Sequence, residues 1–370
     1  MASSTGSTPT LGVEEEFLLV DPTSGAPVAL NRAVADRAAR DGVDLQLELT
    51  SCQVETTSSV VENTSDLRDE LLRLRTVAAG AAEAAGAQLL AVGLPPTLPS
   101  QFPVTDTPRY RDIGERFGMI AHEQGICGCH VHVAVPDRDA AIGVSNRLRP
   151  WLPLLLALTA NSAIYRNADT GHASWRSVLW ARWPSAGPPP QFDSADEYDA
   201  AVQMLCHSGV IRDDGMVYWD VRPSRNFPTI EVRVADVPAT VAESVTFAAL
   251  VRGCVMTALE EHRRGEPVQP LASFALKAAY WKAARDGLDG DSLDLQEHAP
   301  AATRQLLEQL IERVRPALEQ VGDYELVSSG LAGVAERGNG AMRQQAAWRR
   351  SHEVSDVLAE AAAATLESPS

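Results

Sequence analysis

Carboxylates and imidazoles recur on the polar faces of several segments that alternate like β-strands. They are Glu14 and Glu16, Glu48, Glu55, His130 and His132, and Glu231. In Thr229–Asp236, the period of two along a strand puts Glu231 and Arg233 on one face and three aliphatic side chains on the other. So many acids on one sheet face repel each other unless cations bind among them. Oxygen ligands favour hard ions, so we expect Mg²⁺ or, as a second choice, Mn²⁺.

A magnesium centre beside arginines is typical of phosphoryl transfer, because Mg²⁺ in proteins usually accompanies a phosphate. Arg233, Arg222 and Arg176 could supply positive charge to a phosphoryl transition state. The sequence contains neither a Gly-x-x-x-x-Gly-Lys-Ser/Thr loop nor a dinucleotide-binding Gly-x-Gly-x-x-Gly loop. A bound ATP would therefore be held by another architecture.

Two other interpretations of the same residues remain open. The acids could simply face water on half-exposed strands, as in a binding module. Alternatively, a metal-dependent hydrolase could use the carboxylates with His130 as general base, needing neither Arg233 nor ATP. A structural zinc site in Cys127–His132 is excluded, because strand alternation points the cysteines away from the histidines. One question about the strand faces also stays open. Glu48 and Glu55 are seven residues apart, so in a continuous strand they would point to opposite faces, and they share a face only if the break at Ser51-Cys52 interrupts the alternation.

The elements that must position these residues are an antiparallel set of strands with helices around it. We expect strands over Thr10–Asp21, Val43–Leu49, Gln53–Thr57, Gln88–Gly93, Gly125–Val135, Met216–Arg222 and Thr229–Asp236. We expect helices over Asn31–Arg40, Ser65–Ala85, Arg109–Glu123, Asp139–Ser162, Ser194–His207, Val241–His262, Ala272–Ala284, Ala301–Gln320 and Gly340–Leu366. Leu94–Thr107 and Tyr165–Pro190 are candidate lids. Residues 1–10 are expected to be disordered, and residues 11–370 to form a single domain.

Composition limits the classes of partner. The chain has 370 residues with 32 Lys plus Arg and 49 Asp plus Glu, a net charge of −17. Such an acidic chain is a poor candidate for nucleic-acid binding. No apolar run approaches the ~20 residues of a membrane span, and Met1–Pro9 lacks the apolar core of a secretory signal. The five cysteines show no framework spacing, which favours a reducing cytoplasm without disulfides.

Four sequence motifs, in the same order along the chain, resemble those of one family. GVEEEFLLVD, CGCHVHVAV, TGHASWRSVLW and DGMVYWDVRPS…FPTIEVRVADVP are similar to those of YbdK-type carboxylate–amine ligases, which belong to glutamate–cysteine ligase family 2. The similarity runs from about Leu11 to about Gly253. It implies an α+β fold in which a curved antiparallel sheet forms a funnel flanked by helices, related to the catalytic sheet of glutamine synthetase. Asn161-Ser162-Ala163 stands where the family would have Asn-Ser-Pro.

The resemblance also implies roles for individual residues. The metal-binding glutamates would be Glu14, Glu16, Glu48, Glu55 and Glu231. His130 and Arg233 would be catalytic, Arg176 would hold the amino-acid substrate, and Arg222 and His132 are assigned to substrate binding as well. The implied reaction is ATP-dependent: the γ-carboxylate of glutamate is phosphorylated, and an amine such as cysteine attacks the acyl phosphate. The expected partners are small amino acids and amines, with neither nucleic acid nor membrane. The sequence leaves open whether the protein forms a homodimer.

Overall fold

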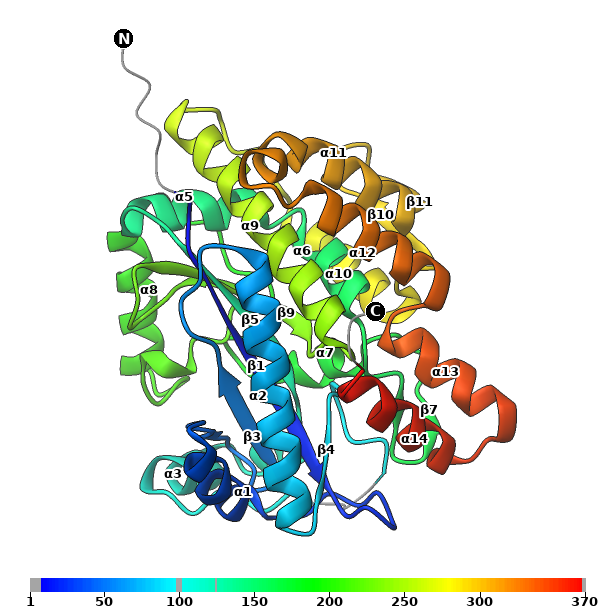
Figure 1. Ribbon diagram of the computed structural model, residues 1–370. Coiled ribbons are helices and arrows are strands. Elements are labelled where there is room, and N and C mark those ends of the chain that lie inside the picture. Colours follow the sequence, from blue (N-terminus) through cyan, green and yellow to red (C-terminus); the bar gives the residue numbers. More distant parts are fainter. Residues whose placement is uncertain (1–7, 98–101, 124, 368–370) are drawn as a thin grey trace.

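The computed structural model describes residues 8–97, 102–123 and 125–367. At its centre a seven-stranded antiparallel sheet has the order β2-β3-β1-β5-β9-β8, and β4 also pairs with β1 (Figure 1). The strands are β1 (Leu11–Val20), β2 (Gln46–Leu47), β3 (Gln53–Thr57), β4 (Gln88–Leu90), β5 (Gly128–Ala134), β8 (Val221–Pro223) and β9 (Thr229–Asp236). The sheet stays open instead of closing into a barrel. An antiparallel sheet packed against separate helices confirms the expected α+β class.

Helices surround the sheet. They are α1 (Asn31–Ala38), α2 (Thr64–Ala84), α3 (Pro108–Phe117), α4 (Met119–His122), α5 (Arg138–Leu148), α6 (Leu152–Thr159), α7 (Trp175–Trp180), α8 (Ala195–His207), α9 (Val241–Arg263), α10 (Ser273–Asp286), α11 (Thr303–Val321), α12 (Tyr324–Arg337), α13 (Gly340–Ser351) and α14 (Val354–Thr365). Figure 1 shows α2 and α9 lying across the same face of the sheet. The largest hydrophobic core lies there, between the aliphatic side chains of β1, β5 and β9 and the buried helix α9.

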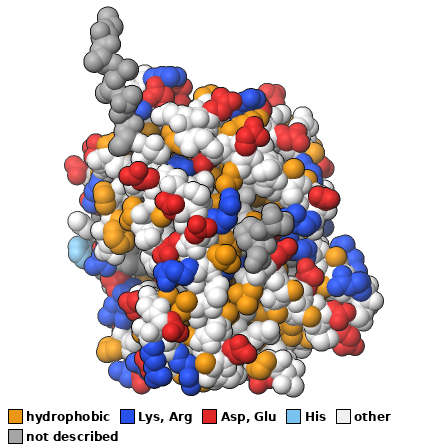
Figure 2. Space-filling model, in the orientation of Figure 1, with side chains coloured by type: hydrophobic (Ala, Val, Ile, Leu, Met, Phe, Trp, Pro, Cys, Tyr) orange, Lys and Arg blue, Asp and Glu red, His pale blue; other side chains and the backbone are white. Residues whose placement is uncertain are grey.

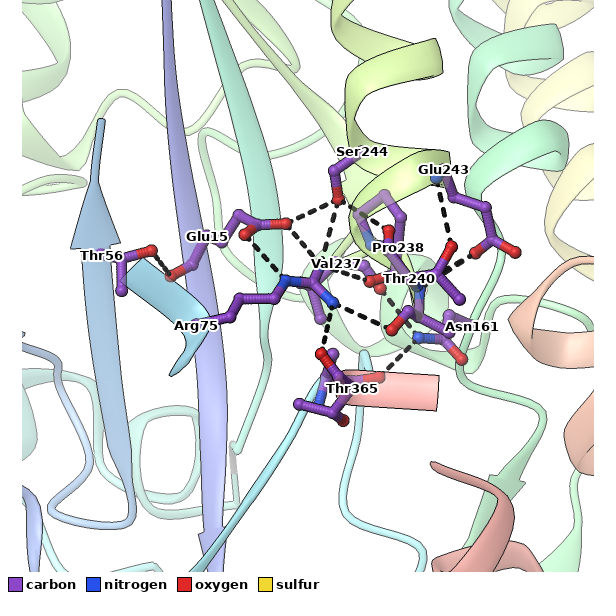
Figure 3. A network of polar contacts seen from close by, with 12 residues as sticks. Glu15, Thr56, Arg75, Asn161, Val237, Pro238, Thr240, Glu243, Ser244 and Thr365 are labelled. Carbon is purple, nitrogen blue, oxygen red and sulfur yellow. Dashed lines mark hydrogen bonds and ion pairs between the residues drawn. The ribbon is translucent and has the colours of Figure 1, made fainter. Parts of the chain in front are cut away.

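Strand β1 shows how one sequence serves two faces. Its residues alternate between buried and half-buried from Leu11 to Glu16, with Glu15 on the fully buried side. Arg75 of α2 reaches Glu15 with two hydrogen bonds, Nε to Oε2 at 3.0 Å and Nη2 to Oε1 at 2.6 Å (Figure 3). The same guanidinium donates to the carbonyls of Pro238, Ala239 and Thr365. It thereby fixes β1, the β9–α9 connection and the end of α14 to one another.

Several element boundaries differ from the sequence-based predictions. Val43–Leu49 contains only the two-residue β2, and Met216–Arg222 is replaced by a 3₁₀ turn at Asp214–Met216 followed by the short β8. The long helix over Asp139–Ser162 breaks into α5 and α6, because the chain cannot continue helical hydrogen bonding through Pro150 and Pro153. Strands Gln53–Thr57 and Thr229–Asp236 are confirmed to the residue.

The C-terminal third is less uniformly helical than predicted. A hairpin of β10 (Asp291–Asp294) and β11 (Ala299–Ala302) precedes α11, and α12 was not predicted. The last predicted helix divides at His352, which has φ 56° and ends α13. Within Tyr165–Pro190 lie α7 and a small hairpin, β6 (Ile164–Tyr165) with β7 (Ala168–Asp169).

Helix α9 qualifies one expectation about apolar runs. Within the described ranges it is the one helix long and apolar enough to cross a membrane, and 83% of its most apolar window is buried inside the protein. Because most of it is buried, α9 is a core helix of the fold. Such helices can be as long and as apolar as a membrane-spanning helix. All five cysteines are free, and four of them are buried. On the face seen in Figure 2, acidic and basic side chains are interspersed.

Candidate active site

A cavity of about 190 Å³ lies over the face of the sheet opposite α2 and α9. It is lined by seven of the residues singled out from the sequence: Glu14, Glu16, Glu48, Glu55, His130, Arg176 and Arg233. The other three candidates lie beside it. Glu231 pairs with the lining residue Arg233, and His132 contacts the lining residue Glu14. Arg222 lies one step further away and pairs with Glu231. A larger groove of about 1050 Å³ between α9 and α11 contains none of these residues.

Strand register brings the first group together. Glu14 lies directly opposite His130 on β5, and Glu16 lies opposite Glu55 on β3. The Glu14 carboxylate is 2.9 Å from Nδ1 of His130 and 3.3 Å from Nε2 of His132. Glu16 accepts a hydrogen bond of 2.6 Å from the Gly128 backbone N–H. The predicted polar face of β1 is therefore the floor of the cavity.

The open question about Glu48 and Glu55 is answered by the β2–β3 hairpin. Gln46 lies opposite Glu55, so the two residues share a face of the sheet. Glu48 follows Gln46 by two residues and continues on that same face, and both acids line the cavity. The chain reversal after Leu47, rather than the seven-residue separation, decides their common side.

Two arginines hold Glu231 from either side. Arg222 contacts it through Nε at 2.8 Å and Nη2 at 3.2 Å, and Arg233 makes a further ion pair. Arg233 also places Nη1 3.2 Å from Nδ1 of His130. That nitrogen can accept from Arg233 or donate to Glu14, but not both, so the tautomer of His130 depends on which neighbour it serves.

The acids of the cavity are not electrostatically equivalent. Burial, together with the neighbouring carboxylates, raises the pKa of Glu55 well above its ordinary value and also raises the pKa of Glu48. Burial likewise raises the pKa of Glu16. Burial acts on Glu14 and Glu231 as well, but hydrogen bonds from His130 and His132 lower the pKa of Glu14, and Arg233 with Arg222 lowers that of Glu231. Burial and the nearby Arg233 lower the pKa of His130.

These donors fit a divalent cation. Ligand atoms of Glu14, His130 and Glu231 lie within 4.8 Å of one another, and so do those of Glu16, Glu55 and His130. Burial and repulsion between the carboxylates both raise the pKa values of Glu16, Glu48 and Glu55, and a cation among them would offset the repulsion. Carboxylate-rich sets with a single imidazole suit Mg²⁺ or Mn²⁺.

The walls of the cavity contain aromatic and charged residues that were not among the candidates from the sequence. Trp180 and Trp183 line it together with Tyr218, whose ring centroid lies 4.7 Å from that of Trp180. Arg109 and Tyr110, from the first turn of α3, close another side. No local pattern marks these residues, because each arrives from an element distant in sequence. Arg176 and Trp180 come from the candidate lid Tyr165–Pro190, whereas residues 98–101 of the other candidate lid lie outside the described residues.

Comparison with known proteins points to one family. The model of glutamate–cysteine ligase family 2 (GCS2) matches residues 10–360. A protein of Mycolicibacterium vanbaalenii named "Putative glutamate–cysteine ligase 2-2" is 80% identical over 359 residues, covering 97% of this chain and 98% of the relative. A relative from Nocardia farcinica, "Putative glutamate–cysteine ligase 2-1", is 59% identical, with 97% and 94% coverage.

Solved structures share the fold at low sequence identity. A bifunctional glutathione synthetase from Pasteurella multocida has a TM-score of 0.70 at 14% identity, and the match covers 96% of this chain and 52% of that one. A glutamate–cysteine ligase from Francisella tularensis, solved in complex with AMP, has a TM-score of 0.66 at 14% identity, with 97% and 89% coverage. From the family match over most of its length and the extent of its identity to these relatives, the chain belongs to glutamate–cysteine ligase family 2.

Proposed function

We propose that the protein is an ATP-dependent carboxylate–amine ligase that joins the γ-carboxylate of glutamate to an amine such as cysteine through an acyl phosphate. The observation that carries the proposal is the presence, in one cavity, of four glutamates with the buried Arg176 and the half-buried Arg233. Membership of the family and the AMP complex of a protein with the same fold support it. Cytoplasmic location and small-molecule substrates belong to the same proposal.

The acidic residues would hold the metal. Glu14, Glu16, Glu48, Glu55 and Glu231 would bind Mg²⁺, which spreads and neutralises the negative charge of bound phosphates. Glu231 would have to share its carboxylate with Arg222 and Arg233, since both already contact it. His132 lies with Nε2 3.3 Å from the second oxygen of Glu14. These contacts would orient the ligand oxygens before substrate arrives.

The cationic and imidazole groups would act on the reacting atoms. Arg233 projects from β9 beside His130 and would stabilise the phosphoryl group during transfer. Arg176, 3% exposed, would bind a carboxylate of the amino acid. Burial and Arg233 lower the pKa of His130, which favours the neutral imidazole, and this imidazole could take the proton that the attacking amine releases. The aromatic walls would help to keep water from the acyl phosphate.

The experiment is ADP release measured with MgATP, glutamate and a panel of amino acids and amines. A ligase gives ADP and phosphate that depend on both the acid and an amine. A metal-dependent hydrolase would instead turn over ester, amide or phosphate substrates with metal alone, and a binding module would release nothing. ADP release that ignores the amine, or its absence across the panel, would contradict the proposed function.

A further inference from the structure

Arg176 enters the cavity across a glycine. It is the second residue of α7, and its guanidinium lies over Gly128 of β5, where a Cβ atom would come within 2.5 Å of Nη2. The side chain is 3% exposed, yet its Nε has no hydrogen-bond partner among the described residues. Nη1 is 3.5 Å from the Val234 carbonyl, a long contact. A buried guanidinium with open donors is prepared for an anionic ligand.

The charge that compensates Arg176 is Asp236, the last residue of β9. Asp236 lies opposite Gly128 across the β5–β9 ladder, is fully buried, and has Oδ1 3.6 Å from Nη1 of Arg176. Three neutral donors already fill its carboxylate. The Asn161 N–H and the Ser162 hydroxyl donate to Oδ2 at 2.8 and 2.7 Å, and the Ser174 hydroxyl donates to Oδ1 at 2.8 Å. Asp236 thus balances the charge of Arg176 without consuming its hydrogen-bond donors.

The same two hydroxyls hold the backbone that carries Arg176. Ser162 accepts from the Arg176 N–H at 3.0 Å, and Ser174, the N-cap of α7, accepts from the Ser177 N–H at 3.2 Å. Because Asp236 accepts a hydrogen bond from each hydroxyl, it orients the lone pairs of both oxygens toward these amides. The orientation of the first turn of α7 therefore depends on one buried carboxylate.

The opposite side of Asp236 is equally constrained. Asn161 donates through Nδ2 to the carbonyls of Ala91 and Val237. Gly93 packs directly against the Asp236 carboxylate, because a Cβ atom at this position would lie 2.9 Å from the carboxylate. Arg75 holds the next two carbonyls, Pro238 and Ala239 (Figure 3). The carboxylate has no room to move away from Arg176.

We infer that Asp236, acting with Ser162 and Ser174, is the positioning residue that aims Arg176 at the carboxylate-bearing substrate. The inference rests on the proposed function for the identity of that substrate. Asp236 does not line the cavity and touches no reacting atom, so its effect must pass through Arg176. It should therefore act on binding of the amino acid and leave the binding of MgATP unchanged.

Asp236→Asn tests this, because the amide keeps the shape and one acceptor but removes the charge. In steady-state ADP release we expect the KM for glutamate to rise by about tenfold, the scale of one misplaced charge-assisted contact. The KM for MgATP and kcat should stay within about threefold. Ser174→Ala, which removes the hydrogen bonds of one hydroxyl but keeps the charge of Asp236, should give a smaller rise in the same constant. Asp323→Asn is the matched control: Asp323 is another buried aspartate paired with an arginine, Arg252, away from the cavity, and it should affect stability alone.

A double-mutant cycle with Arg176→Lys separates positioning from general loosening of the fold. If Asp236 works through Arg176, adding Asp236→Asn to Arg176→Lys will raise the KM for glutamate no further. Multiplying effects, or an equal rise in the KM for MgATP, would overturn the inference.

A binding measurement covers the case in which the proposed reaction fails. If the wild type releases no ADP with any amine, the proposed ligase function fails, and the inference is then judged by the thermal shift that glutamate produces. A wild-type shift that Asp236→Asn abolishes supports it. No wild-type shift, or an equal shift in both proteins, overturns it.

Discussion

Replacing Arg75 by methionine tests the buried network that holds the site strand from behind. Arg75 and Glu15 are both fully buried, and among the residues that the structure describes the Glu15 carboxylate would retain only the Ser244 hydroxyl, at 2.6 Å, as a partner. Removing one member of a buried ion pair costs about 3–5 kcal/mol, because the other charge stays buried without compensation. The carbonyls of Pro238, Ala239 and Thr365 also lose a donor, which adds about 1 kcal/mol or more.

We therefore expect Arg75→Met to lower the free energy of unfolding by about 5 kcal/mol, a large share of the 5–15 kcal/mol typical of folded proteins. Equilibrium urea unfolding at pH 7, followed by circular dichroism and by tryptophan fluorescence, measures the change. The double variant Glu15→Gln/Arg75→Met should recover part of the loss, because no uncompensated charge is then buried.

Arg73→Met is the matched control on the same helix. Arg73 pairs with Glu70 at 2.9 Å, but its side chain is 47% exposed. Exposed pairs of this kind contribute about 0.5 kcal/mol or less. An Arg75→Met protein within about 1 kcal/mol of wild type would refute the reasoning, since the carboxylate of Glu15 would then have to be solvated or protonated at little cost.

Three further outcomes follow from the cavity and its neighbours. Arg233→Lys should keep the fold but lower kcat for ADP formation by about 10²-fold or more, because lysine cannot make a two-pronged contact with a phosphoryl group; an unchanged kcat with an active amine would remove Arg233 from the mechanism. Glu16→Gln should melt at the same or a higher temperature without metal, since burial raises the pKa of Glu16, and should show a smaller Mg²⁺-induced thermal shift; unfolding of the metal-free variant alone would make Glu16 structural. Burial raises the pKa of Asp220 from 3.8 to about 6, so its ionisation costs the folded state stability as pH rises through that window. Asp220→Asn should accordingly gain up to about 3 kcal/mol in urea unfolding at pH 8 and almost nothing at pH 4, and a gain independent of pH would count against this origin.

Local periodicity was sufficient for the strands that carry the acids. Glu14 and Glu16 alternate with apolar neighbours in β1, and Glu231 with Arg233 in β9, so their common face follows from the period of two alone. The same rule placed Glu15 on the buried side of β1, although a lone glutamate there gave no indication of its partner. Arg75 lies 60 residues away on another element.

The same rule failed where packing overrides the periodicity of the sequence. Met216–Arg222 alternates like a strand, but the 3₁₀ turn at Asp214–Met216 and the packing of Met216 and Val217 into an aromatic cluster override that pattern. Intrinsic strand preference is weak next to side-chain packing. The turn and the short β8 that follow bring Arg222 opposite Glu231, a contact that alternation alone does not specify.

The sequence by itself determined which side chains share a strand face, because that depends only on the geometry of neighbouring residues. Tertiary structure decided everything that requires two distant segments to meet. The β2–β3 hairpin put Glu48 beside Glu55, α3 and Tyr218 closed the cavity, and the end of β9 brought Asp236 to Arg176 from the start of α7. Such contacts depend on strand register, on chain reversals and on the pairing of buried opposite charges. These are set by the packing of the whole chain, and therefore no periodic pattern in a single segment predicts them.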